Sequence, residues 1–483
     1  MRSTDKKIIR RVIAVGILIA VILCMNHVAV LSFDRVRNAD YFNYDMEQLE
    51  KQHADVDLMI VGASQVYHGC NPDVISAEMG IHEVVECASA ASHNDGMYYM
   101  LKDLLGRFTP KCVVIDLTWS KFMDKNVPVL SMAKLLSADR MSWPRKIEYA
   151  AHNFNLDEWM KLLFPMYRYG GSVWGFSQLK ANYFARKAVR AGNWVDESKR
   201  RYRKNGFTWV NAGCPQGSIP SEVVSYSNDL VSSYETDYMK KLWKLCDEKG
   251  VQVIWCTLPT SMVELYGIQN YQDSPDYMKA FAEELGCTYL NFNLLKGREA
   301  FLPDTCFSDK VHLNGTGSVA FSKVFAQAVK KVLDGEDPSG MFYENIDEMK
   351  KNVHRIVGCN GMVNPVGDGT LSVTVTSLQN EDITPEYRLV LMEKGKKKKA
   401  RKNNDVSGSG AGDADADEDV GTDAGAENYP EVRPWQEETA FSVEESEVPD
   451  GYALRVEVRQ KGKRDMEAFQ DELGSTYKIK MGD

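Results

Sequence analysis

Long apolar runs are scarce in this sequence of 483 residues. Beyond the amino terminus, no stretch is long and apolar enough to cross a bilayer. The ten cysteines include no Cys-x-x-Cys pair and no Cys/His grouping of the kind that binds zinc. An excess of positive charge is also lacking, since the formal net charge is −10. These absences argue against a multi-span membrane protein, a zinc-binding protein and a nucleic-acid partner.

The amino terminus differs in kind from the rest of the chain. A stretch that is mostly apolar, residues 12–31, follows five basic residues: Arg2, Lys6, Lys7, Arg10 and Arg11. As a helix it would reach about 30 Å, the thickness of a hydrocarbon core. We expect a transmembrane anchor within residues 1–33, with the amino end cytoplasmic and the bulk of the chain extracytoplasmic. A cleaved signal peptide and a buried soluble helix are the alternatives.

Strand-like and helix-like patterns alternate from residue 57 to residue 335. Apolar runs typical of buried strands occur at 58–62, 83–88, 112–117, 251–256 and 288–291. Helical spacing lies between them, and an amphipathic helix over 319–333 closes the region. After a helical lead-in over 34–56, this alternation predicts an α/β fold with a parallel sheet.

Two segments break the alternation. Residues 121–235 are rich in aromatic and basic side chains and are expected to form a partly helical insertion over the sheet. Its rings would suit a sugar-stacking surface, but aromatics this numerous more often form core, which is the interpretation we favour. Residues 336–483 carry strand-like runs that predict a small β-sandwich. A charged low-complexity insert over 394–428 interrupts it and cannot bury enough surface to fold.

A serine follows the first predicted strand. Gly62 permits a close backbone turn there, and Asn71-Pro72 opens a helix a few residues later. Ser64 is therefore expected just past the carboxyl edge of a strand, where open α/β sheets place their ligands. A Gly-x-Ser in this position is more often an ordinary turn, so a second motif has to decide.

That second motif lies about 250 positions downstream. Asp309 stands three residues before His312, so on a turn its carboxylate can reach one ring nitrogen and leave the other facing Ser64. Asn314 or Thr316 can then cap the following helix. Nucleophilic acyl chemistry needs a hydroxyl, a base and a group that orients the base. We predict Ser64, His312 and Asp309 in these roles; a turn serine and a satisfied loop pair are the alternative interpretation.

Both motifs resemble sequence blocks of the SGNH (GDSL-type) hydrolases. Gly62-x-Ser64 with Asn71-Pro72 is similar to the first block, and Asp309-x-x-His312-Leu313-Asn314-x-x-Gly317 is similar to the last. The resemblance covers about residues 57–334. It implies a flavodoxin-like three-layer α/β/α fold and ester chemistry that needs neither a cofactor nor a metal.

The middle blocks of the family are less similar. The second block supplies an oxyanion glycine, and here Ser92 is nearest that position, with Asn94 or Gly96 as alternatives. The third block's Gly-x-Asn-Asp is absent, because Leu117-Thr118-Trp119 follows the third strand. Besides these candidates, the backbone N–H of Ser64 is expected to serve as an oxyanion donor, and one further donor is unassigned.

These departures, together with the expected anchor, resemble the alginate-type O-acetyltransferases and the proteins that assist D-alanylation of teichoic acids. The resemblance implies a multi-pass membrane O-acyltransferase as a partner and a cell-envelope polysaccharide or teichoic-acid-like polymer as the acceptor. We therefore expect a serine acyltransferase or esterase. The alternative is a non-catalytic SGNH-like scaffold, or a glycan-binding protein, that assists such a membrane enzyme.

Overall fold

The computed structural model describes residues 3–33, 38–89, 93–118, 141–164, 176–192, 200–212, 225–393, 429–465, 467–470 and 473–475. At its centre lies a sheet of five parallel strands: β1 (Val56–Gly62), β2 (Glu83–Ala88), β3 (Cys112–Asp116), β6 (Gln252–Thr257) and β7 (Thr288–Asn291). Their order is β2-β1-β3-β6-β7, which is the order of flavodoxin-like doubly wound sheets. The predicted parallel sheet is confirmed.

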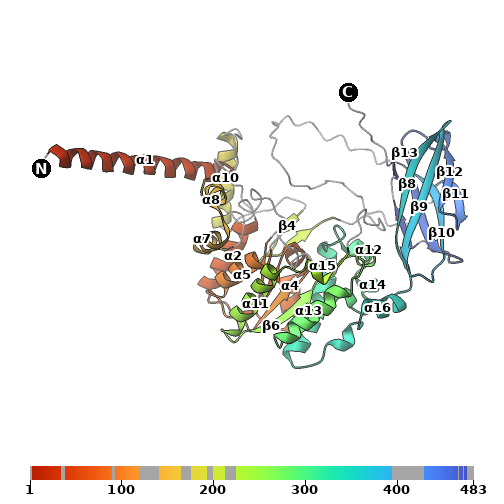
Figure 1. Cartoon of the computed structure of the whole chain (residues 1–483), viewed down its shortest axis with the longest axis horizontal. Helices are drawn as coiled ribbons and strands as arrows, with labels where there is room; N and C mark the ends of the chain where they lie inside the picture. The colour runs from red at the N-terminus through yellow and green to blue at the C-terminus, as the bar shows by residue number, and fades with distance from the viewer. Residues whose placement is uncertain are drawn as a thin grey trace.

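Helices cover both faces of this sheet (Figure 1). One face packs against α2 (Asn38–Lys51), α5 (Asn94–Leu104), α7 (Trp143–Asn153), α11 (Ser233–Asp247) and α13 (Asp273–Glu284). The other packs against α3 (Ser64–Gly69), α4 (Pro72–Met79) and α15 (Gly315–Leu333).

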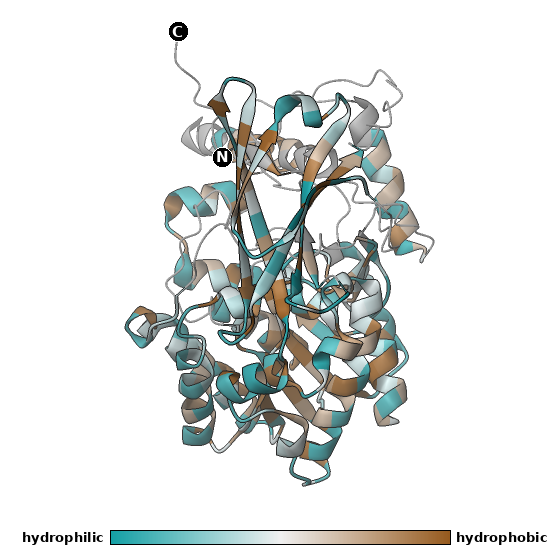
Figure 2. Cartoon of the chain, turned by 90° about the vertical axis from the view of Figure 1, so that its right-hand side faces the viewer, coloured by the Kyte–Doolittle hydropathy of each residue, from teal (hydrophilic) through white to brown (hydrophobic). Residues whose placement is uncertain are grey.

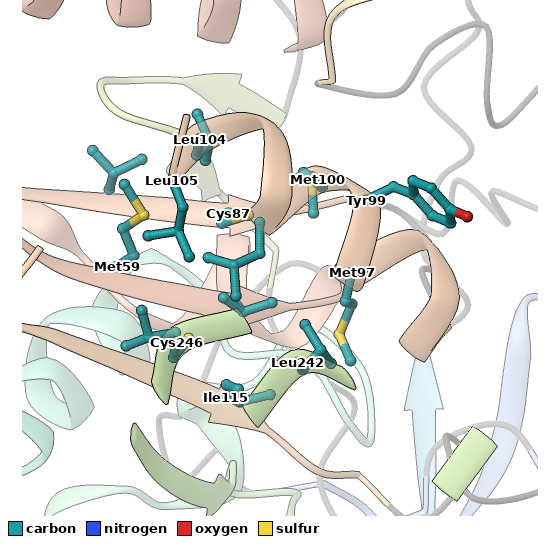
Figure 3. Packing of buried hydrophobic residues seen from close by; sticks show 14 of the residues in the cluster. Met59, Cys87, Met97, Tyr99, Met100, Leu104, Leu105, Ile115, Leu242 and Cys246 are labelled. Atoms are coloured by element: carbon teal, nitrogen blue, oxygen red, sulfur yellow. The ribbon is translucent and has the colours of Figure 1, made fainter. Parts of the chain in front are cut away.

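Strand β1 shows how one sheet supplies two cores. Successive side chains of a strand point to opposite faces, so Met59 and Val61 join the first core, whereas Leu58 and Ile60 join the second. Figure 3 shows the first core, where side chains of the sheet meet those of α5 and α11. The result is a three-layer α/β/α arrangement in which β1, an interior strand of the sheet, carries the Ser64 turn at its carboxyl end.

The helix ends follow local sequence signals. Asn71 caps α4 by accepting a hydrogen bond from the Asp73 N–H at 3.2 Å, and Pro72 occupies the first helical position. Gly250 and Gly286, which follow α11 and α13, each adopt a φ of 67°. This left-handed conformation favours glycine.

The aromatic-rich insertion is partly helical, as predicted. Its described part comprises α7, the first part of α11 and further short elements: α8 (Leu156–Leu163), α10 (Phe176–Arg190), β4 (Arg200–Tyr202), β5 (Thr208–Val210) and η2 (Asn228–Leu230). Tyr202 is buried, whereas Trp143 and Tyr183 are each 53% exposed, so these aromatics are divided between core and surface. The rest of the predicted insertion lies outside the described residues.

Two further sheets follow the α/β part. One has the order β11-β10-β13-β14 and the other β12-β9-β8-β15, formed by β8 (Ile356–Gly367), β9 (Thr370–Gln379), β10 (Pro385–Glu393), β11 (Glu431–Gln436), β12 (Ala440–Glu444), β13 (Tyr452–Gln460), β14 (Ala468–Gln470) and β15 (Gly474–Ser475). Val373 of one sheet and Leu389 and Val456 of the other are buried in one shared core. These strands face the viewer in Figure 2. The predicted insert over 394–428 lies outside the described residues.

The remaining helical segments are short, and those between α15 and β8 connect the two parts. These short segments are α12 (Met262–Gly267), η3 (Phe292–Leu294), α14 (Arg298–Phe301), η4 (Asp304–Cys306), η5 (Ser339–Met341) and α16 (Ile346–Asn352), with η6 (Glu445–Glu447) inside the sandwich. The nine cysteines among the described residues are free thiols, and Cys87, Cys112 and Cys256 are buried.

The amino-terminal helix requires a correction. Helix α1 (Ser3–Phe33) extends away from the rest of the described chain (Figure 1), and Val12 and Leu23 are 66% and 62% exposed. Its apolar run is interrupted by Asn26 and His27 and preceded by charged residues. Within the described residues, no helix combines the length and the apolar character needed to cross a membrane. The predicted transmembrane helix is therefore not supported.

Candidate active site

Ser64 lies at the carboxyl edge of strand β1, which pairs with β2 on one side and β3 on the other. The strand ends at Gly62, and Ser64 is the first residue of α3. A Cβ atom on Gly62 would lie 2.3 Å from Val66 Cγ2 and 3.1 Å from Asp116 Cβ. The turn therefore needs glycine because helix α3 and the end of β3 both pack closely against it.

His312 and Asp309 lie on a tight loop between η4 and α15. Phe307 and Leu313 form an antiparallel bridge across the loop, and the Ser308 N–H donates to the His312 carbonyl oxygen at 2.8 Å. Asn314 caps α15 by accepting from the Gly317 N–H at 2.9 Å. Of the two caps that the sequence offered, the structure thus uses Asn314.

The structure brings the three predicted residues together. Ser64 Oγ lies 2.7 Å from His312 Nε2, and His312 Nδ1 lies 2.7 Å from Asp309 Oδ2. A carboxylate only accepts hydrogen bonds, so Nδ1–H is the donor to Asp309, and Nε2 of the neutral ring is left to accept the Ser64 hydroxyl proton. The geometry is that of a nucleophile, a base and a group that orients the base.

The Asp309 carboxylate is held from two sides. Its Oδ1 atom accepts hydrogen bonds from the backbone N–H groups of Val311 at 2.9 Å and of His312 at 2.8 Å, while Oδ2 faces the ring. Burial acts to raise the pKa of Asp309, but the hydrogen bond and charge of His312 and the two backbone donors outweigh it and lower this pKa. The carboxyl group is therefore ionised at neutral pH.

The structure describes some of the residues predicted to bind the oxyanion but not others. Ser92 lies outside the described residues. Asn94 is buried at the start of α5, where its backbone N–H donates to Glu235 Oε2 at 3.2 Å and its side-chain amide to the Glu235 carbonyl oxygen at 3.3 Å. The backbone N–H and one side-chain N–H of Asn94 are thus directed to Glu235. The assignment of Ser92, Asn94 and the Ser64 N–H to the oxyanion stays a prediction.

Sequence reasoning missed a second histidine beside the first. His68 is buried one helical turn after Ser64, and its ring packs edge-on against the His312 ring, with 5.6 Å between centroids. His68 Nδ1 lies 3.1 Å from the carbonyl oxygen of Thr208 in β5. The spacing of four residues from Ser64 on a helix was the available signal, but the contact with β5 depends on the insertion.

The β4–β5 hairpin also packs against the loop that carries His312. A Cβ atom on Gly315, the first residue of α15, would lie 2.0 Å from Cε2 of Trp209. Glycine at this position therefore lets the indole ring lie directly on the helix start. Part of the aromatic-rich insertion thus borders the candidate site.

Metal ligation has no support among the described residues, where no group of three or more His, Cys, Asp or Glu side chains could hold a metal ion. The candidate site itself contains the Ser64 hydroxyl, the His312 imidazole and the Asp309 carboxylate.

Comparison with known proteins gives weak resemblances. No protein-family model and no curated protein matches it. Among solved structures, it is similar to a GDSL-like lipase from Bacteroides thetaiotaomicron VPI-5482, with 11% identity over 61% of this chain and 100% of the lipase and a TM-score of 0.29. It is also similar to the endo-β-1,4-mannanase from Thermotoga petrophila, with 10% identity over 87% of this chain and 98% of the mannanase and a TM-score of 0.18. At such TM-scores, neither likeness establishes a shared fold or family.

Proposed function

We propose that this chain is a serine-dependent esterase or acyltransferase that acts on O-acyl groups. The observation that carries the proposal is the hydrogen-bonded series from Ser64 through His312 to Asp309, with 2.7 Å at each step. The acidic partner is ionised, the imidazole has its accepting nitrogen toward the hydroxyl, and the hydroxyl lies at the sheet edge where doubly wound folds bind ligands. These are the requirements for an activated serine nucleophile.

The proposed reaction has two steps. In the first, His312 Nε2 takes the Ser64 proton while Ser64 Oγ bonds to the ester carbonyl carbon, and His312 then gives that proton to the departing alkoxide. In the second, water or an acceptor hydroxyl attacks the acyl-serine, with His312 again acting first as base and then as acid. Water as the attacking group gives hydrolysis, and an acceptor hydroxyl gives transfer. Asp309 keeps the ring oriented and stabilises its positive charge in both steps.

The oxyanion of each tetrahedral intermediate needs hydrogen-bond donors. The first N–H groups of a helix have no acceptor within that helix, and Ser64 opens α3. Its backbone N–H is the donor that we propose for the oxyanion. Removal of one such donor typically lowers the rate by about 10²–10³-fold. The rate of the proposed reaction therefore depends strongly on the further oxyanion donor that is still unassigned.

The acceptor and the partner rest on the sequence resemblance alone. A hydroxyl of a cell-envelope polysaccharide or teichoic-acid-like polymer as acceptor stays a prediction. The same holds for the multi-pass O-acyltransferase as acyl donor and for the extracytoplasmic location.

The proposal is tested by turnover of p-nitrophenyl acetate by the full-length chain. Ser64→Ala and His312→Ala should each lower kcat by on the order of 10⁴-fold or more, because each removes a member of one reacting unit. Ser339→Ala, an exposed serine beyond α15, is the matched control and should turn over like the wild type. A fluorophosphonate should label the wild type at Ser64. Equal rates in all variants, or no labelling, would favour the scaffold interpretation.

A further inference from the structure

The side chain of Gln65, the residue after Ser64, bridges two segments of the candidate site. Its Oε1 atom lies 2.7 Å from Thr118 Oγ1, just past the end of β3. Its Nε2 atom lies 3.2 Å from the carbonyl oxygen of Val311, directly before His312. The proposed function described above gives Gln65 no role.

The chemistry of its neighbours fixes how the Gln65 amide is turned. A carbonyl oxygen can only accept, so the atom that faces Val311 must be the NH₂ group. The amide oxygen then faces Thr118, whose hydroxyl can donate to it. Both ends of the amide are therefore satisfied in one orientation, whereas the flipped amide would set two oxygens against each other at Val311.

Thr118 is itself placed by the sheet. Its Oγ1 atom lies 3.1 Å from each carboxylate oxygen of Asp116, the last residue of β3, which is fully buried. A hydroxyl has one proton, so Thr118 donates either to Asp116 or, over the shorter 2.7 Å, to Gln65 Oε1, and not to both at once. Thr118 also follows the third strand, the place where the SGNH hydrolases that the sequence resembles carry Gly-x-Asn-Asp. The end of β3 thus supplies a fixed hydroxyl that orients the amide beside the nucleophile.

The loop with His312 has few other ties across the site. Within the described chain, the Ser261 N–H donates to the Lys310 carbonyl oxygen at 2.8 Å, on the side of β6. On the side of Ser64, the His68 ring packs against the His312 ring, and two hydrogen bonds join described residues, Ser64–His312 and Gln65–Val311. A shift of the loop would lengthen both together.

We propose that Gln65 is a positioning residue that holds the His312 loop in reach of Ser64, and that Thr118 sets the orientation of its amide. The catalytic part of this inference rests on the proposed function. Misplacement of reacting groups by about 1 Å can cost 10²-fold in rate. Gln65→Leu, which keeps the bulk but removes both bonds, should therefore lower kcat by roughly 10- to 100-fold and leave KM within a factor of about three.

The coupling to Thr118 gives the sharper test. Thr118→Val removes the hydroxyl and keeps the shape of the side chain, so it should lower kcat, but by a smaller factor than Gln65→Leu does. Thr118→Ser keeps the hydroxyl and should retain the wild-type kcat. The double variant Gln65→Leu/Thr118→Val should be no slower than Gln65→Leu alone, since both changes break one series of bonds. Independent, multiplying effects would overturn the proposal, as would a kcat for Gln65→Leu within twofold of an active wild type.

Hydrogen–deuterium exchange of residues 308–313 in the full-length chain gives a readout that needs no activity. Exchange should rise in Gln65→Leu and Thr118→Val and stay at the wild-type level in Thr118→Ser. Unchanged exchange in Gln65→Leu would overturn the proposal whatever the rates are. If the wild type neither turns over nor takes the fluorophosphonate, the proposed function fails together with the catalytic part of this inference, while the exchange result still decides whether Gln65 holds the loop.

Discussion

Asp309 is the residue whose replacement tests the proposed mechanism most directly. In Asp309→Asn, the side-chain oxygen is still needed by the N–H groups of Val311 and His312, which donate to Oδ1. The new NH₂ group must then occupy the Oδ2 position and donate to His312 Nδ1. The ring would be held in the tautomer with its proton on Nε2, which cannot accept the Ser64 proton. We expect kcat to fall on the order of 10³–10⁴-fold, measured with p-nitrophenyl acetate.

The matched control for this change is Asp337→Asn. Asp337 also accepts a backbone N–H, that of Ser339 at 2.8 Å, but it follows the far end of α15. Its replacement should leave kcat unchanged. An Asp309→Asn variant that retains more than a tenth of the wild-type rate would show that the orientation of His312 does not depend on this carboxylate.

The sequence allowed the Ser64, Asp309 and His312 arrangement to be predicted because its signals are local. A strand end, a glycine and a spacing of three residues placed each group on the correct edge. The partners of Asn94 and Gln65 could not be predicted in this way, because Glu235 and Val311 lie 141 and 246 positions away from them. Contacts over such separations depend on the packing of the insertion and of the final loop, which no short pattern encodes.

At the scale of elements, helix α15 is tied to the His312 loop by its own cap. Asn314 Oδ1 accepts from the Gly317 N–H at 2.9 Å, and its Nδ2 donates to the carbonyl oxygens of Thr305 at 2.7 Å and of Phe307 at 3.3 Å. Asn314→Ala removes all three bonds and should cost about 2 kcal/mol of unfolding free energy. Asn314→Ser keeps a capping oxygen but not the two donors, so about half that loss is expected.

Urea denaturation followed by circular dichroism measures both losses. The control is Asn155→Ala, which removes an exposed cap on α8 whose side chain accepts only from the Glu158 N–H at 3.0 Å. Its cost should be about 1 kcal/mol or less. If Asn314→Ala and Asn155→Ala cost the same, the two donors to the η4 segment contribute nothing measurable to stability.

Elements with strong apolar patterns were predicted close to their observed bounds. Strand β2 was expected over 83–88 and spans Glu83–Ala88. Strand β8 (Ile356–Gly367) was missed, because its glycines, asparagines and proline have low strand propensity. It is stabilised instead by antiparallel pairing with β9 along its length. At Gly361 a Cβ atom would lie 2.6 Å from Leu473 Cδ2. Packing therefore requires glycine at this position, although glycine has a low strand propensity.

For the whole molecule, the alternation of strands and helices was sufficient to predict a parallel α/β sheet followed by a β-sandwich. The transmembrane prediction for the amino-terminal helix is not supported at this scale: basic residues precede an apolar run, but Asn26 and His27 interrupt that run. The contact between the α/β part and the sandwich was beyond prediction. It is formed by short helices whose sequences carry no long periodic pattern.

That contact is a hydrophobic cluster around Met349 of α16. Met349 is fully buried and shares the cluster with Leu265 of α12, at the α/β part, and with Val357 of β8, at the sandwich. Met349→Ala would leave a cavity where the two parts meet, and such a deletion costs about 2–5 kcal/mol. We expect the midpoint of urea denaturation to fall accordingly, while kcat of the folded variant stays at the wild-type value because Ser64, His312 and Asp309 are not part of this cluster. Met160→Ala removes the same side chain at a site that is 40% exposed, and should change stability by no more than about 0.5 kcal/mol. Equal shifts of the midpoint in the two variants would mean that the cluster does not hold the sandwich to the α/β part.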